Sequence, residues 1–220
     1  MAEDYYLNNY KEINISGDIS NVVTKLMHRF LENGRDSLLF EKVLEVGALN
    51  GEHTHFVNHK FLQYYVTDIR SPSQSTIDEL NKRGYRFRLA DVENLPFEDA
   101  YFDRVISTCL LHHLENPEQG ISEILRVVKS GGTIDILVPN DPSFIYSTSW
   151  FVTTGVRALL KRKFRESYLN RKSEHIKDLK SIEVSLLSYK KFFLIEKKHF
   201  PNVFKLKNLA VLFRFTIVKS

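Results

Sequence analysis

The sequence predicts a doubly wound α/β fold with a mostly parallel sheet, and two observations carry this prediction. From residue 42 to residue 139, short apolar runs alternate with helix-compatible stretches of about a dozen residues, the pattern of right-handed crossovers between parallel strands. The last two apolar runs lie too close together for a crossover, so we expect them to pair antiparallel. The composition, 43% hydrophobic and 26% charged, is that of a globular protein and excludes a disordered chain or a coiled coil.

An amphipathic helix is predicted ahead of the first strand. Asp18 can cap its N-terminus, apolar residues follow at helical spacing, and Gly34 can end it. The predicted strands, in chain order, are residues 42–46, 61–68, 85–90, 102–110, 133–139, 192–200 and 209–219.

Helices are predicted between most of these strands. They cover residues 51–59, 71–84, 117–129 and 176–189. Gly131-Gly132 is expected to terminate the third of them, because glycine favours the end of a helix. Residues 140–175 show no strand pattern and are predicted to form an inserted cap.

The residues just past each strand are the candidates for chemistry, because open parallel sheets bind ligands at the carboxyl ends of their strands. Gly47 and Gly51 follow the first strand, where glycine lets the backbone approach a ligand closely. Glu52 stands where a dinucleotide fingerprint would have its third glycine, which argues against a nicotinamide cofactor. Asp68, after the second strand, can accept both hydroxyls of a ribose. Asp91, after the third, can accept from an exocyclic amine or cap its own turn.

These stretches together resemble the Rossmann-like S-adenosylmethionine-dependent methyltransferases, over most of residues 41–140. The matching segments are VLEVGALNG (43–51), VTD (66–68), LADVENLPFEDAYFDRVIS (89–107) and LLHHLENPEQGISEILRVVKSGG (110–132). The resemblance implies a seven-stranded sheet that ends in an antiparallel hairpin, and S-adenosyl-L-methionine as the cofactor. Leu49 is a departure, because the family usually has glycine there.

The resemblance also implies roles for individual residues. Gly47 and Gly51 would lie next to the methionine part of the cofactor, and Asp68 would bind the ribose hydroxyls. Asp91, with the amide of Val92, would read the adenine. The complete predicted cofactor site is Glu45, Gly47, Ala48, Gly51, Asp68, Asp91 and Val92.

His112 and His113 follow the fourth strand and face the expected position of the methyl group. An imidazole with a pKa near ~6.5 is a suitable base for a hydroxyl acceptor, so both are candidates for base or orienting residue. The alternative is that one of them packs against the sheet edge and shapes the loop. The loop reads TCLLH (108–112) and lacks the Asn/Asp-Pro-Pro-aromatic sequence typical of enzymes that methylate base amines, which argues against that acceptor class.

Other reactive side chains have simpler interpretations. Cys109, the single cysteine, cannot form an intramolecular disulfide and is predicted to be a buried small hydrophobe. His53, His55 and His59 invite a metal interpretation, with the last two on one helix face. No matching Cys or acidic set lies nearby, so they are predicted to be residues of a surface helix, and no metal is predicted. No secretion signal is recognisable at the N-terminus, so the expected location is the cytoplasm, including the inner membrane surface.

The chain, residues 1–220, is predicted to be a single domain with four parts. These are an N-terminal helical addition (1–40), a cofactor-binding core (41–139), the cap (140–175) and a C-terminal helix and hairpin (176–220). Charge is distributed unevenly over them: residues 1–150 carry 14 basic and 22 acidic residues, whereas residues 151–220 carry 17 and 5, a net of +12. The basic third predicts an anionic partner, or else a solvated basic face.

The cap and the N-terminal helix are expected to select the methyl acceptor. The cap combines apolar residues with the basic run Lys161-Arg162-Lys163 and Arg165, so it is predicted either to lie on a membrane surface or to close over the site as a lid. PNDPSFIY, a basic stretch and SEHI (173–176) resemble bacterial methyltransferases of surface-polysaccharide gene clusters. Asp141 and His175 are assigned to the acceptor pocket on this basis, although His175 could simply precede a helix.

The predicted function is methyl transfer from S-adenosylmethionine to an oxygen of a small or lipid-linked anionic acceptor of the sugar type, as in polysaccharide biosynthesis. One alternative is an RNA-directed methyltransferase, which the basic third suggests. The other is a non-catalytic partner protein that binds S-adenosylmethionine weakly, which Leu49 suggests.

Overall fold

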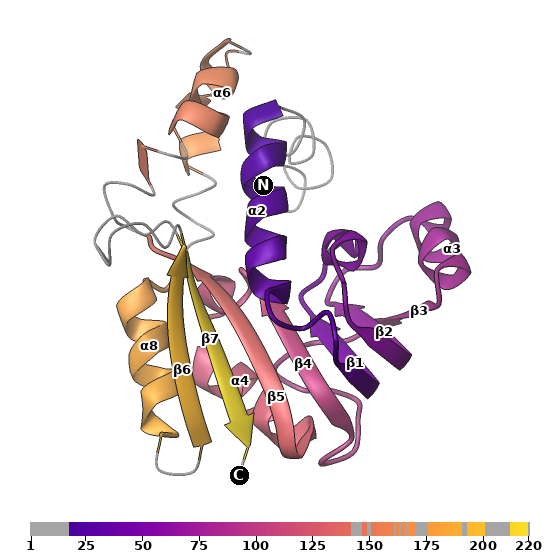
Figure 1. The fold of residues 1–220 in the computed structure, drawn as a ribbon. Helices are drawn as coiled ribbons and strands as arrows, with labels where there is room; N and C mark the ends of the chain where they lie inside the picture. The colour runs from indigo at the N-terminus through magenta and orange to yellow at the C-terminus, as the bar shows by residue number, and fades with distance from the viewer. Residues whose placement is uncertain are drawn as a thin grey trace.

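The computed structural model describes residues 18–141, 147–148, 151–160, 162, 164–165, 167–169, 176–190, 193–200 and 212–219. The strands are β1 (Leu39–Val46), β2 (Lys60–Asp68), β3 (Tyr85–Leu89), β4 (Phe102–Thr108), β5 (Val128–Pro139), β6 (Phe193–Phe200) and β7 (Leu212–Lys219). They form one seven-stranded sheet in the order β3-β2-β1-β4-β5-β7-β6 (Figure 1). Strands β1 to β5 pair in parallel, and β7 is antiparallel to both neighbours, so the predicted C-terminal hairpin is confirmed.

Helices lie on both faces of this sheet (Figure 1). The α-helices outside the cap are α2 (Asp18–Glu32), α3 (Gln74–Lys82), α4 (Pro117–Val127) and α8 (Leu179–Ser188). The cap contributes a π-helical turn, η4 (Phe151–Gly155), continued by α6 (Val156–Leu160). Two 3-10 turns, η2 (Glu52–His55) and η3 (Leu111–His113), follow β1 and β4.

Side-chain caps fix where three of these helices begin. The side chains of Ser73, Asn116 and Asp178 each accept a hydrogen bond from a backbone amide three residues later. Such a bond satisfies an amide that the first helical turn leaves without a partner. None of the helices in the described part of the chain is both long and apolar enough to cross a membrane.

The structure corrects two of the predicted connections. Residues 51–59 form only the short turn η2, because the chain leaves the helical path at Phe56 and so brings both His53 and His59 to Glu32 of α2. Gly131-Gly132 does not end α4. That helix stops at Val127, and the glycines lie inside β5, where a register shift against β4 accommodates them.

The core is divided between the two faces of the sheet. Leu44, Val105 and Ile134 point to the face covered by α4 and α8, where most of the buried apolar residues gather. Val43 and Ile106 point the other way, toward Leu31 of α2. Successive strand residues alternate between these two faces, which leaves the carboxyl ends of the strands as a shared edge for a site.

Candidate cofactor and acceptor site

The backbone is in the left-handed conformation at three positions of the turn after β1. Gly47 and Gly51 have φ of 64° and 72°, and Leu49 between them has φ of 52°. A Cβ built on Gly47 would lie 2.6 Å from Cδ1 of Leu110, so a larger residue would have to displace that side chain as well as adopt a left-handed backbone. Leu49 adopts a conformation that costs a residue with a Cβ about 1–2 kcal/mol, which explains why glycine is the usual residue there.

Asp68 ends β2 with a buried carboxylate directed at the β1 turn. Its Oδ2 accepts the Leu49 amide at 2.8 Å, and its Oδ1 accepts the Arg70 amide at 2.9 Å. A carboxylate has about four lone-pair sites, so each oxygen can still accept a hydroxyl. These two amides orient Asp68, and its remaining acceptor capacity fits the two hydroxyls of a ribose.

Asp91 and Val92 follow β3 at the same edge. Oδ1 of Asp91 accepts the Glu93 amide at 2.9 Å, and the carboxylate is exposed. The Val92 side chain is buried in the core on the α4 side, which anchors the loop. The turn-capping interpretation of Asp91 therefore holds, and the carboxylate remains accessible to an amine donor as well.

Two buried oxygen atoms near the strand ends have no hydrogen-bond partner among the described residues: Oε1 of Glu45 and Oγ of Ser107. Tyr64 donates to the other oxygen of Glu45 at 3.1 Å, and burial raises the pKa of the Glu45 carboxyl above its usual range. Buried polar atoms without partners are rare, and they suit a ligand that brings hydrogen-bond donors. The residues present therefore fit S-adenosylmethionine, which carries an ammonium group and hydroxyls. Ser107 was missed by the sequence analysis, and its only signal was a polar residue near the end of an apolar strand.

His112 and His113 stand side by side in η3, with ring centroids 4.0 Å apart. His112 is buried, and its carbonyl accepts the amides of Ile176 and Lys177 at 2.9 and 3.1 Å. His113 is partly exposed. The loop therefore gives the two histidines different positions: the carbonyl of His112 binds the segment before α8, and His113 has the more accessible imidazole.

Asp141 lies past the end of β5 and joins the same region. Its carbonyl accepts the Leu179 amide at 3.3 Å, close to the segment that His112 binds. The structure thus brings the ends of β4 and β5 together with residues 176–179. His175 itself lies outside the described residues, as do Lys161 and Lys163 of the basic run.

The remaining candidates do not form a reactive site. Burial raises the pKa of the Cys109 thiol to about 12, which makes it a poor nucleophile. His53 and His59 contact Glu32, whereas His55 is exposed next to Arg83. The predicted shared helix face of His55 and His59 is wrong, because η2 ends at His55. In the described part of the chain, no group of three or more metal-binding side chains is placed to hold an ion.

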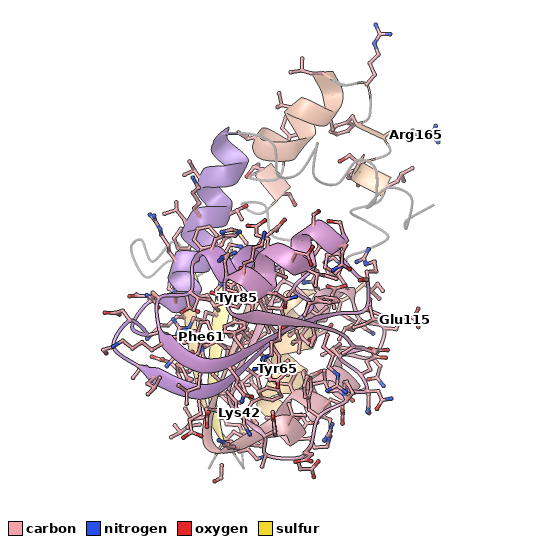
Figure 2. All side chains as sticks on the ribbon, turned by 90° about the vertical axis from the view of Figure 1, so that its right-hand side faces the viewer. Lys42, Phe61, Tyr65, Tyr85, Glu115 and Arg165 are labelled. Atoms are coloured by element: carbon pink, nitrogen blue, oxygen red, sulfur yellow. The ribbon has the colours of Figure 1, made fainter. Side chains whose placement is uncertain are left out.

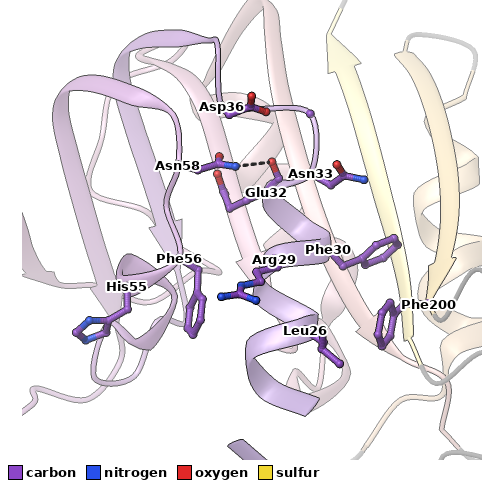
Figure 3. A pocket seen from close by; sticks show the side chains of 11 residues that line it. Leu26, Arg29, Phe30, Glu32, Asn33, Asp36, His55, Phe56, Asn58 and Phe200 are labelled. Atoms are coloured by element: carbon purple, nitrogen blue, oxygen red, sulfur yellow. Dashed lines mark hydrogen bonds between the residues drawn. The ribbon is translucent and has the colours of Figure 1, made fainter. Parts of the chain in front are cut away.

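A pocket of about 590 Å³ lies along α2, and Glu32 and His55 are among the residues that line it (Figure 3). Its lining residues are Leu26, Arg29, Phe30, Glu32, Asn33, Gly34, Asp36, His55, Phe56, Asn58 and Phe200. None of the predicted cofactor or acceptor residues contributes to it, so this pocket is separate from the edge where β1, β2 and β4 end.

Comparisons with known proteins identify a methyltransferase domain in this chain. Residues 44–136 match the family model described as methyltransferase domain. The tRNA (carboxymethyluridine(34)-5-O)-methyltransferase of Arabidopsis thaliana is 32% identical over 99 residues, which cover 44% of this chain and 23% of that protein. The ubiquinone/menaquinone biosynthesis C-methyltransferase UbiE of Stutzerimonas stutzeri is 41% identical over 58 residues, covering 26% and 23%. The chain therefore spans about a quarter of the length of these two relatives.

Similarity in structure extends over the whole chain. The N-methyltransferase NodS from Bradyrhizobium japonicum, solved with S-adenosyl-L-homocysteine, has a TM-score of 0.65 at 13% identity. That match covers 99% of this chain and 96% of the other, and it establishes the fold. Residues 44–136 therefore match a methyltransferase domain, and the chain as a whole shares the fold of the methyltransferase NodS.

Proposed function

We propose that this protein binds S-adenosylmethionine at the carboxyl edge of β1 to β3 and transfers the methyl group to an oxygen of a small or lipid-linked anionic acceptor. The observation that carries the proposal is the buried carboxylate of Asp68, which two amides orient toward the left-handed turn after β1. The bound cofactor supplies a methyl group on a sulfonium, a carbon already activated for displacement.

The protein's own residues then have to align the acceptor and exclude water. Asp68 and Asp91 would hold the nucleoside of the cofactor, and the Glu45 oxygen that has no partner among the described residues would accept from its ammonium group. His113 removes the proton of an acceptor hydroxyl, while His112 fixes the segment that borders the acceptor side. A sugar acceptor in nucleotide- or lipid-linked form brings phosphates that suit the basic C-terminal third.

Calorimetric titration with S-adenosylmethionine tests the cofactor site. Asp68→Ala should weaken binding by about 1–3 kcal/mol, the range for a lost buried hydrogen-bonding group. Asp78→Ala is the matched control, because this carboxylate is exposed on α3, and it should bind as the parent protein does. Equal affinity of the Asp68 variant, with its circular dichroism unchanged, removes Asp68 from the site. No binding by the parent protein overturns the proposal.

Label transfer from methyl-labelled cofactor to a fractionated extract tests the acceptor class. Label in sugars or sugar lipids supports the proposal. His113→Gln should then reduce the rate by about 10²–10⁴-fold while calorimetric cofactor binding is retained, as expected for a lost general base. An unchanged rate contradicts the role of His113. A parent protein that binds the cofactor but labels nothing supports the non-catalytic alternative.

A second candidate function is methylation of RNA. It is favoured by the net charge of +12 over residues 151–220, and one relative is named as a tRNA 5-O-methyltransferase. Proteins similar to this chain include one named as a C-methyltransferase and one named as an N-methyltransferase, so the fold alone does not determine which atom accepts the methyl group. Salt separates the candidates, because binding through many RNA phosphates weakens steeply with ionic strength, whereas binding of a small acceptor with one or two phosphates does not.

A further inference from the structure

The helical segment formed by η4 and α6 presents an apolar face to solvent. Gly155 and Ala158 are buried, on the side where η4 packs against α2. The opposite face carries Val152, Val156, Leu159 and Leu160, which are 56%, 40%, 58% and 80% exposed. Their spacing of four, three and one residues places all four on one helix face. Phe151, 44% exposed, lies beside them.

Basic residues border this apolar face. The sequence from residue 151 to 170 contains five basic residues and a single acidic residue. Arg162, two residues past the end of α6, and Arg165 are both exposed, and Figure 2 shows Arg165 far from the sheet. We name the combined set the cap surface: Phe151, Val152, Val156, Leu159, Leu160, Arg162 and Arg165.

The cap surface stands above the catalytic edge of the sheet. In Figure 1, α6 projects beyond the end of the sheet next to α2, at the edge where the parallel strands have their carboxyl ends. Gly47 and His113 lie past the ends of β1 and β4 at that same edge, and Asp68 is the last residue of β2. A partner bound by the cap surface would therefore be held on the same side of the molecule as the proposed cofactor site.

We propose that the cap surface docks on a membrane that contains anionic lipid. A helical segment of ten residues is too short to span a bilayer, but its apolar side chains can enter the boundary between headgroups and acyl chains by about 5–10 Å. The exposed arginines then meet lipid phosphates, an attraction that adds to the apolar contribution. A nucleic acid would engage the arginines, but it offers no apolar layer for Leu159 and Leu160. Docking does not require methyl transfer, so it can be tested without an acceptor.

Co-sedimentation with vesicles measures this docking. The protein should sediment with vesicles of phosphatidylcholine and phosphatidylglycerol, and much less with phosphatidylcholine alone. Leu159→Glu/Leu160→Glu should reduce binding at least about tenfold, because two apolar side chains are replaced by like-charged groups at the lipid. Arg162→Glu/Arg165→Glu should reduce binding and its dependence on salt.

A matched control separates the site from general surface effects. Leu62 in β2 and Leu194 in β6 are 69% and 78% exposed, so Leu62→Glu/Leu194→Glu makes the same chemical change away from the cap, and it should sediment like the parent. All variants should keep the parent's unfolding midpoint and cofactor affinity. The proposal is overturned if the control loses as much vesicle binding as the Leu159/Leu160 variant. It is also overturned if the parent protein does not bind anionic vesicles. Binding of an RNA oligomer that needs the arginines but not the leucines also overturns it.

Discussion

On the face of the sheet covered by α4 and α8, the inward residues of β4, β5 and β7 include Val105, Ile134 and Phe215. The strand neighbours of these residues point to the α2 face, and they are Arg104, Asp135 and Arg214. The same three strands thus bury hydrocarbon on one side and charge on the other. The face covered by α4 and α8 is stabilised by apolar area, while the α2 face combines apolar residues such as Ile106 with charges that each need a partner.

The charges on the α2 face form a connected network under α2. Arg104 reaches Glu32 of α2 and Asp135 of β5, each at 2.8 Å, with all three side chains at most 1% exposed. Arg35 donates to Asp135 at 2.8 Å, and Arg214 lies 3.3 Å from it. The network therefore ties the helix before β1 to strands that come much later in the chain.

The His28 and His53 rings extend this network along α2. Nδ1 of His28 lies 3.0 Å from Nδ1 of His53, whose Nε2 is 3.0 Å from Glu32. Burial, reinforced by the charge of His53, lowers the pKa of His28 to about 3. Burial alone would raise the pKa of Glu32, but hydrogen bonds to His53 and His59 and the charge of Arg104 hold it below its usual range.

The largest effect is expected from removing the central charge. Arg104→Met leaves Glu32 and Asp135 buried without their cation, which should cost about 3–5 kcal/mol of unfolding free energy. Urea unfolding measures the loss. Lys198→Met is the control, since that lysine pairs with Glu196 at the surface and should change stability by less than about 1 kcal/mol. A loss no greater than that of the control would mean that the α2 face does not depend on its charges.

The apolar face should respond to volume and be indifferent to pH. Ile134 is fully buried, and Ile134→Ala should cost about 2–5 kcal/mol through lost burial and the cavity left behind. The same cost is expected at neutral and at mildly acidic pH, because no titratable group accompanies the substitution. Urea unfolding at both pH values checks this, and a cost that changes with pH would show that the two faces are coupled.

Acid should weaken the α2 face. When the pKa of a histidine is lower in the folded protein than in the unfolded chain, the unfolded chain binds the proton more tightly. The stability of the fold therefore decreases as the pH falls below the pKa of that histidine in the unfolded chain. From about pH 7 to about pH 5, His28 should account for about 2 kcal/mol of lost stability. His28→Phe keeps the stacking on Phe56, whose ring centroid is 4.9 Å away, and should flatten the pH dependence of the urea midpoint. If the urea midpoint of the variant depended on pH as steeply as that of the parent, another group would be responsible for the acid sensitivity.

The smallest effect on stability is expected at Leu49, at the edge of the sheet where the parallel strands end. Leu49→Gly relieves the left-handed strain at φ of 52° but gives the unfolded chain more freedom, so the net gain should be at most about 1 kcal/mol. Thermal unfolding measures this gain, and calorimetry shows whether cofactor affinity changes with it. A loss of stability would mean that the Leu49 side chain packs well enough to outweigh its backbone strain.

Local sequence features determined most of the architecture. The order of strands and helices, the antiparallel hairpin and the edge with Gly47, Asp68 and Asp91 follow from periodicity, spacing and resemblance, since these signals are local. The failed prediction that Gly131-Gly132 ends α4 shows the limit of such signals. Val127 and Val128 are fully buried, and packing moved the helix–strand boundary ahead of the glycines.

Tertiary structure alone decided which charges meet and what the histidines do. Arg104 is 72 residues from Glu32 and 31 from Asp135, and the spacing of residues carries no information about partners so far apart. His53 and His59 look like surface-helix residues in the sequence, yet they are buried against Glu32. Likewise, only the fold placed Ile176 on the carbonyl of His112, because a contact between distant segments depends on how the sheet and its loops pack together.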